Sequence, residues 1–416
     1  MTKENATYVF IHLGEKWVPA GYLTVREDNR SVLSTFAYGN KYLDRKDALS
    51  IDPVQLPLGS GMFRSTAKSP LFGAIRDTSP DGWGRHLLDR AAAPHSPGEF
   101  EYLTALPVED RIGALGFGRS LEQCPAPINP GWPGYPPSGA TLELEDMIKA
   151  TDQIENREEL APQYRRFLFR GSSLGGAQPK APTMYEGRHW IAKFGRQYEA
   201  WSTCRIEHAN AILAQSCGIH VPETKTITVL GRDVFLVSRF DRDDVKNRTP
   251  FISAATLLGT DTLTEGSYQD IAAQMRKYCA KGHLQGDLEQ LFRRMVYNVL
   301  CNNSDDHLRN HGFIYMHGQG WRLSPAYDMV PQPDMGPQTP RLLTLGVGIN
   351  GGREATLSNA LSACPVFGLT KEDGAKIIDT MKTIFLSQWE KTFMKANVPK
   401  KDLPALAEAF VNHHEE

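Results

Sequence analysis

Hydrophobic residues near the start of the chain gather in short runs that polar turn residues separate. The runs cover 8–13, 20–25 and 31–38, are rich in β-branched and aromatic residues, and are divided by Gly, Asn and Asp. This pattern is typical of β-strands joined by turns. A turn cluster with a helical stretch follows at 70–90, and the run RIGALGFG begins at Arg111. We therefore predict a small β-rich unit over residues 1–123.

A stretch rich in proline and glycine comes next. Residues 124–139 contain six prolines and three glycines. Such a composition disfavours helices and strands and favours an extended connection. We predict a linker at 124–139 and a second unit over 140–416.

The hydrophobic pattern of the second unit is mainly helical. Apolar residues recur at helical spacing in 142–155, 201–218, 288–300 and 375–393. Strand patterns occur at 189–195, at 224–242, where a hairpin would turn at Gly231 and Arg232, and at 313–329. The chain is therefore predicted to be an α/β (α+β) protein with a small β-rich N-terminal part and a largely helical C-terminal lobe.

The composition narrows the classes of function. Apolar residues make up 41% of the chain and charged residues 23%, and the formal net charge is -2. This balance is typical of a globular protein and argues against a surface built mainly to bind nucleic acid. The six cysteines form no C-x-x-C pair, and no signal peptide or long apolar segment is evident. We expect a cytoplasmic protein without a membrane segment.

One polar string has the spacing of a phosphoryl-transfer site. In NNSDDHLRNH, Asp305 precedes Asn310 by five residues. This D-x4-N spacing occurs in kinase catalytic loops, where the aspartate accepts the proton of the substrate hydroxyl and the asparagine binds Mg²⁺. Asp328 lies 18 residues beyond Asn310, after a predicted hairpin that could return it to the same metal. Asp305 is thus the candidate base, and Asn310 and Asp328 are candidate Mg²⁺ ligands.

A glycine-rich loop precedes a strand that carries a lysine. In the loop SLGGAQ, Gly175 and Gly176 would let backbone N–H groups approach phosphate oxygens closely. Lys193 on the next strand is placed to pair with nucleotide phosphates, and Glu207 on the following helix could hold that lysine by an ion pair. The order of these features predicts an ATP site between about residues 171 and 330.

The same stretches resemble the successive motifs of one kinase family. RGSSLGGAQPK, WIAKFG, RIEHANAILAQSCGIHVPET, FLVSRFDR, NNSDDHLRN and LSPAYDM are similar to the motifs of HipA-family kinases from about Ser172 to Asp328. A looser likeness extends to SPDGWGRHLLDR and RIGALGF in the N-terminal unit. The resemblance implies a two-lobed HipA-like kinase fold and an ATP- and Mg²⁺-dependent serine/threonine protein kinase that acts as the toxin of a toxin–antitoxin system.

The resemblance also implies partners and further site residues. Members of this family typically phosphorylate an aminoacyl-tRNA synthetase and are neutralised by a small helix-turn-helix antitoxin, through which any DNA contact would come. The roles that it transfers to this chain are the catalytic loop (Asp305, His307, Asn310), the phosphate-contacting loop (Gly175, Gly176, Ala177, Gln178, Lys180), the nucleotide lysine Lys193, the adenine hinge (Ser238, Arg239, Phe240), the metal-binding pair Tyr327 and Asp328, and autophosphorylation at Ser173.

Three positions depart from the family pattern. Pro179 stands where Glu is frequent, Asp306 stands where a small residue is common, and Ser172 beside Ser173 leaves the autophosphorylation site ambiguous. His307 and His311 could alternatively bind zinc, although the glutamate of an H-E-x-x-H motif is lacking. Two other functions stay open: a small-molecule phosphotransferase with the same D-x4-N spacing, and a nucleotide-binding regulatory module that accompanies a DNA-binding antitoxin.

Overall fold

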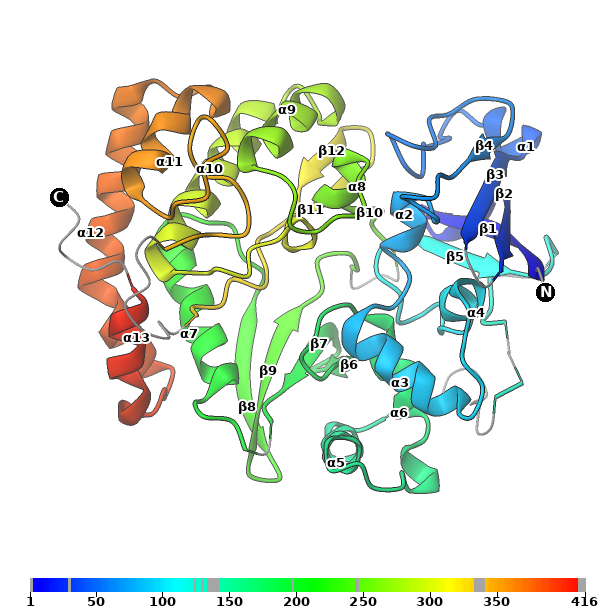
Figure 1. Cartoon of the computed structure of the whole chain (residues 1–416), viewed down its shortest axis with the longest axis horizontal. Coiled ribbons are helices and arrows are strands. Elements are labelled where there is room, and N and C mark those ends of the chain that lie inside the picture. Colours follow the sequence, from blue (N-terminus) through cyan, green and yellow to red (C-terminus); the bar gives the residue numbers. More distant parts are fainter. Residues whose placement is uncertain are drawn as a thin grey trace.

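The computed structural model describes residues 3–28, 31–122, 125–128, 131–132, 142–196, 198–243, 247–332 and 341–410. Most of the predicted linker at 124–139 lies outside the described residues, so its boundaries stay a prediction. The N-terminal elements lie on one side of the molecule and the helices of the C-terminal half on the other (Figure 1). This arrangement confirms the predicted mixed fold with a β-rich N-terminal part.

The N-terminal unit is built on a five-stranded antiparallel sheet. The three predicted runs form its long strands, and two short strands complete the order β4-β3-β2-β1-β5. Their bounds are β1 Lys3–Leu13, β2 Lys16–Glu27, β3 Val32–Tyr38, β4 Phe63–Arg64 and β5 Leu115–Gly118. The short helices α1 Asn40–Leu43, α2 Gly73–Arg76 and α4 Glu99–Thr104 connect the strands, together with the longer α3 Gly82–Ala92.

A second antiparallel sheet carries the predicted lysine strand. Its order is β6-β7-β9-β8, with β6 Lys180–Tyr185, β7 Arg188–Phe194, β8 Thr224–Val229 and β9 Arg232–Ser238. The hairpin turns at Leu230 and Gly231, one residue before the predicted position, and both residues have positive φ angles of 50° and 75°. Positive φ at both central positions defines a type I′ two-residue hairpin, and Arg232 accordingly pairs with Val229 as the first residue of β9.

Helices and a small third sheet form the remaining lobe. The sheet has the order β10-β11-β12, with β10 Phe251–Ser253, β11 Gly312–Met316 and β12 Gly320–Leu323. The main helices are α5 Leu144–Glu155, α7 Thr203–Ser216, α9 Tyr268–Tyr278, α10 Leu284–Cys301 and α12 Lys371–Lys395. Shorter ones are α6 Phe167–Arg170, α8 Ala254–Leu258, α11 Leu357–Ala363 and α13 Leu403–Ala409. Within the described part of the chain, no helix combines the length and apolarity needed to cross a membrane.

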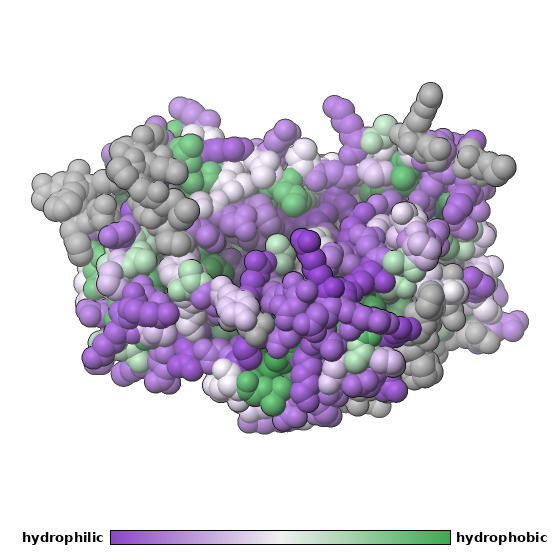
Figure 2. All heavy atoms as spheres, turned by 60° about the horizontal axis from the view of Figure 1, so that its bottom comes forward, coloured by the Kyte–Doolittle hydropathy of each residue, from purple (hydrophilic) through white to green (hydrophobic). Residues whose placement is uncertain are grey.

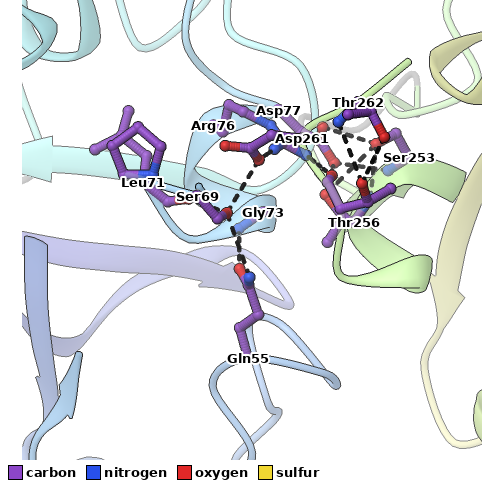
Figure 3. Close-up of polar contacts among 12 residues, drawn as sticks. Gln55, Ser69, Leu71, Gly73, Arg76, Asp77, Ser253, Thr256, Asp261 and Thr262 are labelled. Atoms are coloured by element: carbon purple, nitrogen blue, oxygen red, sulfur yellow. Dashed lines mark hydrogen bonds and ion pairs between the residues drawn. The ribbon is translucent and has the colours of Figure 1, made fainter. Parts of the chain in front are cut away.

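A shared hydrophobic cluster and a polar seam join the two units. A single cluster of buried side chains includes Val9 of β1 and Leu291 of α10. At the seam, the Asp77 carboxylate accepts hydrogen bonds from the Ser253 backbone N–H at 2.7 Å and from the Thr256 hydroxyl at 2.7 Å (Figure 3). A methyl group on Gly73 of α2 would lie only 2.7 Å from the Thr256 hydroxyl oxygen. The N-terminal unit is therefore docked closely on the lobe that carries residues 303–310.

On the face drawn in Figure 2, the described residues form no large apolar patch. The face in Figure 2 is largely hydrophilic, with hydrophobic residues in small separate patches. Scattered apolar residues of this kind are normal on a globular protein.

Candidate functional site

An ion triad joins three segments that are distant in the sequence. Lys193 on β7 lies with its Nζ atom 2.5 Å from Glu207 Oε1 on α7, and it also pairs with the Asp328 carboxylate that follows β12. Lys193 is 6% exposed and Glu207 4% exposed. The structure thus contains the Lys193–Glu207 ion pair that the sequence suggests and adds to it Asp328, which the sequence suggests only as a metal ligand.

The interactions within the triad keep Lys193 and Asp328 in their charged forms. Burial by itself would lower the pKa of Lys193, but the Asp328 and Glu207 carboxylates outweigh it and raise that pKa. Burial would likewise raise the pKa of Asp328, yet Lys193 and Lys180 together lower it well below its ordinary range. Lys193 is therefore a cation and Asp328 an anion at neutral pH, as phosphate and metal binding require.

The glycine-rich loop lies beside a second buried lysine. Lys180 begins β6, pairs in register with Lys193 across the sheet, and is 6% exposed. Gly176 has a φ angle of +95°, and a methyl group there would lie 2.8 Å from the Lys180 Nζ atom. Burial lowers the pKa of Lys180, opposed by Asp328. Gly175 and Ala177 are exposed and Gln178 is partly buried, so the loop lines the approach to these lysines.

Both candidate phosphorylation sites are buried at the start of this loop. The Ser172 hydroxyl donates to the Phe169 carbonyl at 2.8 Å, and the Ser173 hydroxyl donates to the Arg170 carbonyl at 3.1 Å. Ser172 is 0% exposed and Ser173 is 4% exposed. In this conformation both serines act as local caps of the backbone.

The D-x4-N segment forms a tight loop directly after α10. That helix ends at Cys301, and the next residue, Asn302, turns the chain out of the helix with a φ angle of 53°. Asp305 is exposed, and the Asn310 side-chain amide donates to its backbone carbonyl at 2.9 Å. The Tyr327 hydroxyl donates to the Arg309 carbonyl at 2.8 Å, which ties the loop to the residue before Asp328. The backbone thus fixes the span between the candidate base and the candidate metal ligands.

Asp306, which departs from the family pattern, has a structural role. Its carboxylate is 1% exposed, accepts a hydrogen bond from the Tyr268 hydroxyl, and lies 2.8 Å from His311 Nε2. Asn298 in turn donates to the Tyr268 hydroxyl at 2.8 Å. The His311 Nε2 atom is therefore already paired with the buried Asp306 carboxylate. Among the described residues, no three or more His, Cys, Asp or Glu side chains gather as a zinc site requires.

In the proposed adenine hinge, the backbone N–H groups of Ser238 and Arg239 are already used in hydrogen bonds within the protein. The Ser238 N–H donates to Glu223 and the Arg239 N–H donates to His189. The Arg239 side chain is bound to Asp241 at 2.9 and 2.8 Å and to backbone carbonyls of the N-terminal unit. An adenine contact here would need the remaining backbone groups of the segment. The Phe240 ring lies 5.8 Å from that of Tyr327, on the side of the triad.

Two family models match the chain on either side of the predicted linker. The model of the HipA N-terminal domain matches residues 11–118, and the model of the HipA-like C-terminal domain matches residues 172–389. The second match alone covers more than half of the chain. The chain belongs to the HipA family.

Relatives and a solved structure agree with this assignment. A "Putative kinase" of Haemophilus influenzae is 28% identical over 223 residues, which are 46% of this chain and 64%, less than two thirds, of that protein. "Putative kinase Y4dM" of Sinorhizobium fredii is 26% identical over 340 residues, 75% of this chain and 74% of that protein. The HipA chain in a complex of Shewanella oneidensis MR-1 HipA, HipB and operator DNA has a TM-score of 0.66 at 15% identity, over 97% of this chain and 94% of that chain. This likeness shows the HipA fold.

Asp81, a residue that the sequence did not single out, also reaches this HipA-family site. It lies in the segment SPDGWGR of the N-terminal unit and contacts both the glycine-rich loop and the D-x4-N segment. The turn residues of that segment were visible in the sequence, but nothing in them indicated which loops they would meet. Asp306 was noted only as a departure, because its partners Tyr268 and His311 could not be inferred from spacing.

Proposed function

We propose that this chain is an ATP- and Mg²⁺-dependent serine/threonine protein kinase and the toxin of a toxin–antitoxin system. The observation that carries the proposal is the buried contact of Lys193 with both Glu207 and Asp328, beside a glycine-rich loop and the exposed Asp305. A lysine held by a helix glutamate and a metal-binding aspartate in reach of the phosphates are the parts that phosphoryl transfer needs.

The residues present suit a nucleotide and a hard metal ion. Lys193 and Lys180 supply positive charge for phosphate oxygens, and the loop at Gly175 and Gly176 supplies backbone N–H groups. Asp328 and Asn310 offer two oxygen ligands, which suits Mg²⁺ because that ion keeps several waters and takes substrate phosphates as ligands. Bound Mg²⁺ would neutralise charge on the phosphates.

In this proposal the residues of the D-x4-N segment orient the acceptor. Asp305, exposed at the edge of the site, would take the proton of the serine or threonine hydroxyl as that oxygen attacks the γ-phosphorus, while the bond from the γ-phosphorus to the β–γ bridging oxygen breaks and ADP leaves. His307 has a buried Nδ1 atom that meets no hydrogen-bond partner among the described residues, which leaves it able to orient a bound group. Tyr327 holds the Arg309 carbonyl and so supports the loop.

The substrate and partner are proposed from the family. We infer a protein substrate, with an aminoacyl-tRNA synthetase as the first candidate, and a helix-turn-helix antitoxin as the neutralising partner. The relative from Shewanella oneidensis, solved with HipB and operator DNA, supports a DNA-binding antitoxin as partner. We expect the chain to meet DNA only through that antitoxin, in the cytoplasm.

Autophosphorylation of Ser173 or Ser172 would require the loop to move. Both hydroxyls are buried and donate to carbonyls of the preceding helix, so neither can reach the γ-phosphate in this conformation. A phosphate group of about -1.5 to -2 charge could not return to the buried position of the serine hydroxyl beside backbone carbonyls. The phosphorylated loop would therefore stay displaced from its place in this structure. This accounts physically for the expected switch from active to inactive enzyme.

Incubation of the full chain with γ-labelled ATP and Mg²⁺ tests the proposal. Label on protein is expected for the wild type and for Asp379→Asn, which removes an exposed carboxylate on α12. Asp305→Asn should incorporate no label, and mass spectrometry of Ser172→Ala and Ser173→Ala should locate the autophosphorylated residue. Equal labelling of Asp305→Asn and wild type would refute the assignment of the base. Label on a small metabolite alone would favour a small-molecule phosphotransferase.

A further inference from the structure

Asp81 of the N-terminal unit joins the two loops of the proposed transfer site. Its Oδ1 atom accepts a hydrogen bond from the Gly176 N–H at 2.6 Å, and its Oδ2 atom pairs with the Arg309 guanidinium. The Asp81 and Arg309 side chains are 30% and 23% exposed, so the contact is partly shielded from water. One carboxylate thus bridges the glycine-rich loop and the D-x4-N segment, through Gly176 and Arg309, which lie more than 130 residues apart in the chain.

The backbone around Asp81 is shaped for this contact. The Trp83 N–H donates to the Gly176 carbonyl at 2.8 Å, so segment 81–84 bonds both backbone groups of that glycine. A methyl group on Gly82 would lie 2.6 Å from the Gly176 carbonyl oxygen, and one on Gly84 would lie 2.4 Å from the Ser172 carbonyl oxygen. Side chains at these two positions would therefore push the glycine-rich loop away.

The two partners of Asp81 each act on a different part of the transfer reaction. Gly176 belongs to the loop that would cover the nucleotide phosphates and lies next to Lys180. Arg309 directly precedes Asn310, and its carbonyl accepts the Tyr327 hydroxyl. The backbone at Arg309 leads directly to the proposed metal ligand Asn310 and contacts Tyr327, the residue before the other proposed ligand, Asp328. An ion pair that holds Arg309 in place therefore also holds this backbone.

We propose that Asp81 is a positioning residue that couples closure of the glycine-rich loop over ATP to alignment of the catalytic loop. The N-terminal unit thereby becomes part of the phosphoryl-transfer site. The inference rests on the proposed kinase function and adds a role to a residue that touches neither the nucleotide nor the acceptor. Its bond to Gly176 governs nucleotide affinity, and its ion pair with Arg309 governs the rate of transfer.

Two substitutions of Asp81 separate these effects. Asp81→Asn keeps an oxygen that can accept the Gly176 N–H but loses the charge that pairs with Arg309, whereas Asp81→Ala loses both. We expect the KM for ATP to rise about tenfold in Asp81→Ala, as loss of a charge-assisted hydrogen bond implies, and clearly less in Asp81→Asn. The kcat should fall to a similar extent, about tenfold, in both variants.

Glu99→Gln is the matched control. Glu99 lies in the same unit and forms a bidentate pair with Arg85 at 2.6 and 2.7 Å, and both residues line one cavity of about 200 Å³ with Asp81 and Arg309. This variant should keep wild-type KM and kcat. If Asp81→Ala and Asp81→Asn lower the melting temperature and kcat together while the KM for ATP stays at the wild-type value, Asp81 is a purely structural residue and the inference fails. A lower KM would equally overturn it, because Asp81 would then oppose nucleotide binding.

Binding of a fluorescent ATP analogue keeps this test independent of turnover. The Asp305→Asn protein serves as background, since it should bind nucleotide without transferring phosphate. Weaker binding in Asp81→Ala than in Asp81→Asn, with Glu99→Gln unchanged, would support the loop contact even if no kinase activity were found. Equal binding in all four proteins would refute it even if the kinase activity were confirmed.

Discussion

Replacing Asp306 with alanine should destabilise the protein, whereas replacing its neighbour Asp305 with asparagine should remove activity and leave stability nearly unchanged. The Asp306 carboxylate is buried and accepts from the Tyr268 hydroxyl, with His311 Nε2 at 2.8 Å. Burial and the neighbouring Asp306 raise the pKa of Tyr268 well above its ordinary value, so its hydroxyl stays a donor. Each buried group left without its partner costs about 1–3 kcal/mol, so Asp306→Ala should lose about 4 kcal/mol of unfolding free energy.

Urea unfolding followed by tryptophan fluorescence measures this difference. Asp306→Asn keeps one accepting oxygen and should lose roughly half as much, about 2 kcal/mol. Asp305→Asn changes an exposed side chain and should stay within about 0.5 kcal/mol of the wild type. If Asp306→Ala loses less than about 1 kcal/mol of unfolding free energy, the buried network does not stabilise the D-x4-N loop.

Three further predictions concern the ion triad, a buried histidine and the seam between the units. Lys193→Met leaves two carboxylates without their cation, so the unfolding free energy should fall by about 3 kcal/mol and the rate of phosphate transfer by at least about 100-fold. An unchanged unfolding free energy in urea would contradict this. Burial, with help from nearby arginines, lowers the pKa of His12 to about 4. As the pH falls, His12 therefore takes up its proton in the unfolded chain before it does so in the folded protein. The contribution of His12 to the unfolding free energy should be complete above about pH 6.5 and decline as the pH falls toward 4. His12→Phe should remove that part of the pH dependence. Gly73→Ala places a methyl group 2.7 Å from Thr256 Oγ1 and should cost about 1–3 kcal/mol, whereas Gly286→Ala, with open space around it in α10, should stabilise by up to about 1 kcal/mol.

Local patterns were sufficient for most elements of this fold. The strands near the N-terminus, the lysine strand and the long helices follow from two-residue and helical periodicities. The hairpin after Thr224 was misplaced by one residue, because the left-handed conformation of Leu230 is not expected for a leucine. The ends of α10 and α12 also extend beyond the predicted ranges, since helix boundaries depend on caps more than on the hydrophobic pattern.

The site could be predicted only as a set of candidates. The order of Lys193, Glu207 and Asp328 suggested a kinase, but contact between the first and last depends on a chain path of 135 residues. For Arg239 the sequence likeness concerned only the backbone, as part of the adenine hinge, and could not indicate that the buried side chain pairs with Asp241. The role of Asp81 could not be predicted from the sequence, because its contacts with Gly176 and Arg309 depend on tertiary packing and not on the residues next to it in the chain.

Helix α7, which carries Glu207, is held on several sides. Its Arg205 forms a bidentate pair with Asp233 of β9 at 2.6 and 2.8 Å, its Asn210 donates to the Met329 carbonyl at 2.7 Å, and α12 packs along it. Many protein kinases are switched by movement of the helix that bears this glutamate. A helix anchored in this way is poorly suited to swing, so we expect the Lys193–Glu207 pair to persist in the resting enzyme. If the proposed kinase function is correct, we expect control to fall to the short glycine-rich segment, in which Gly175 and Ala177 are exposed.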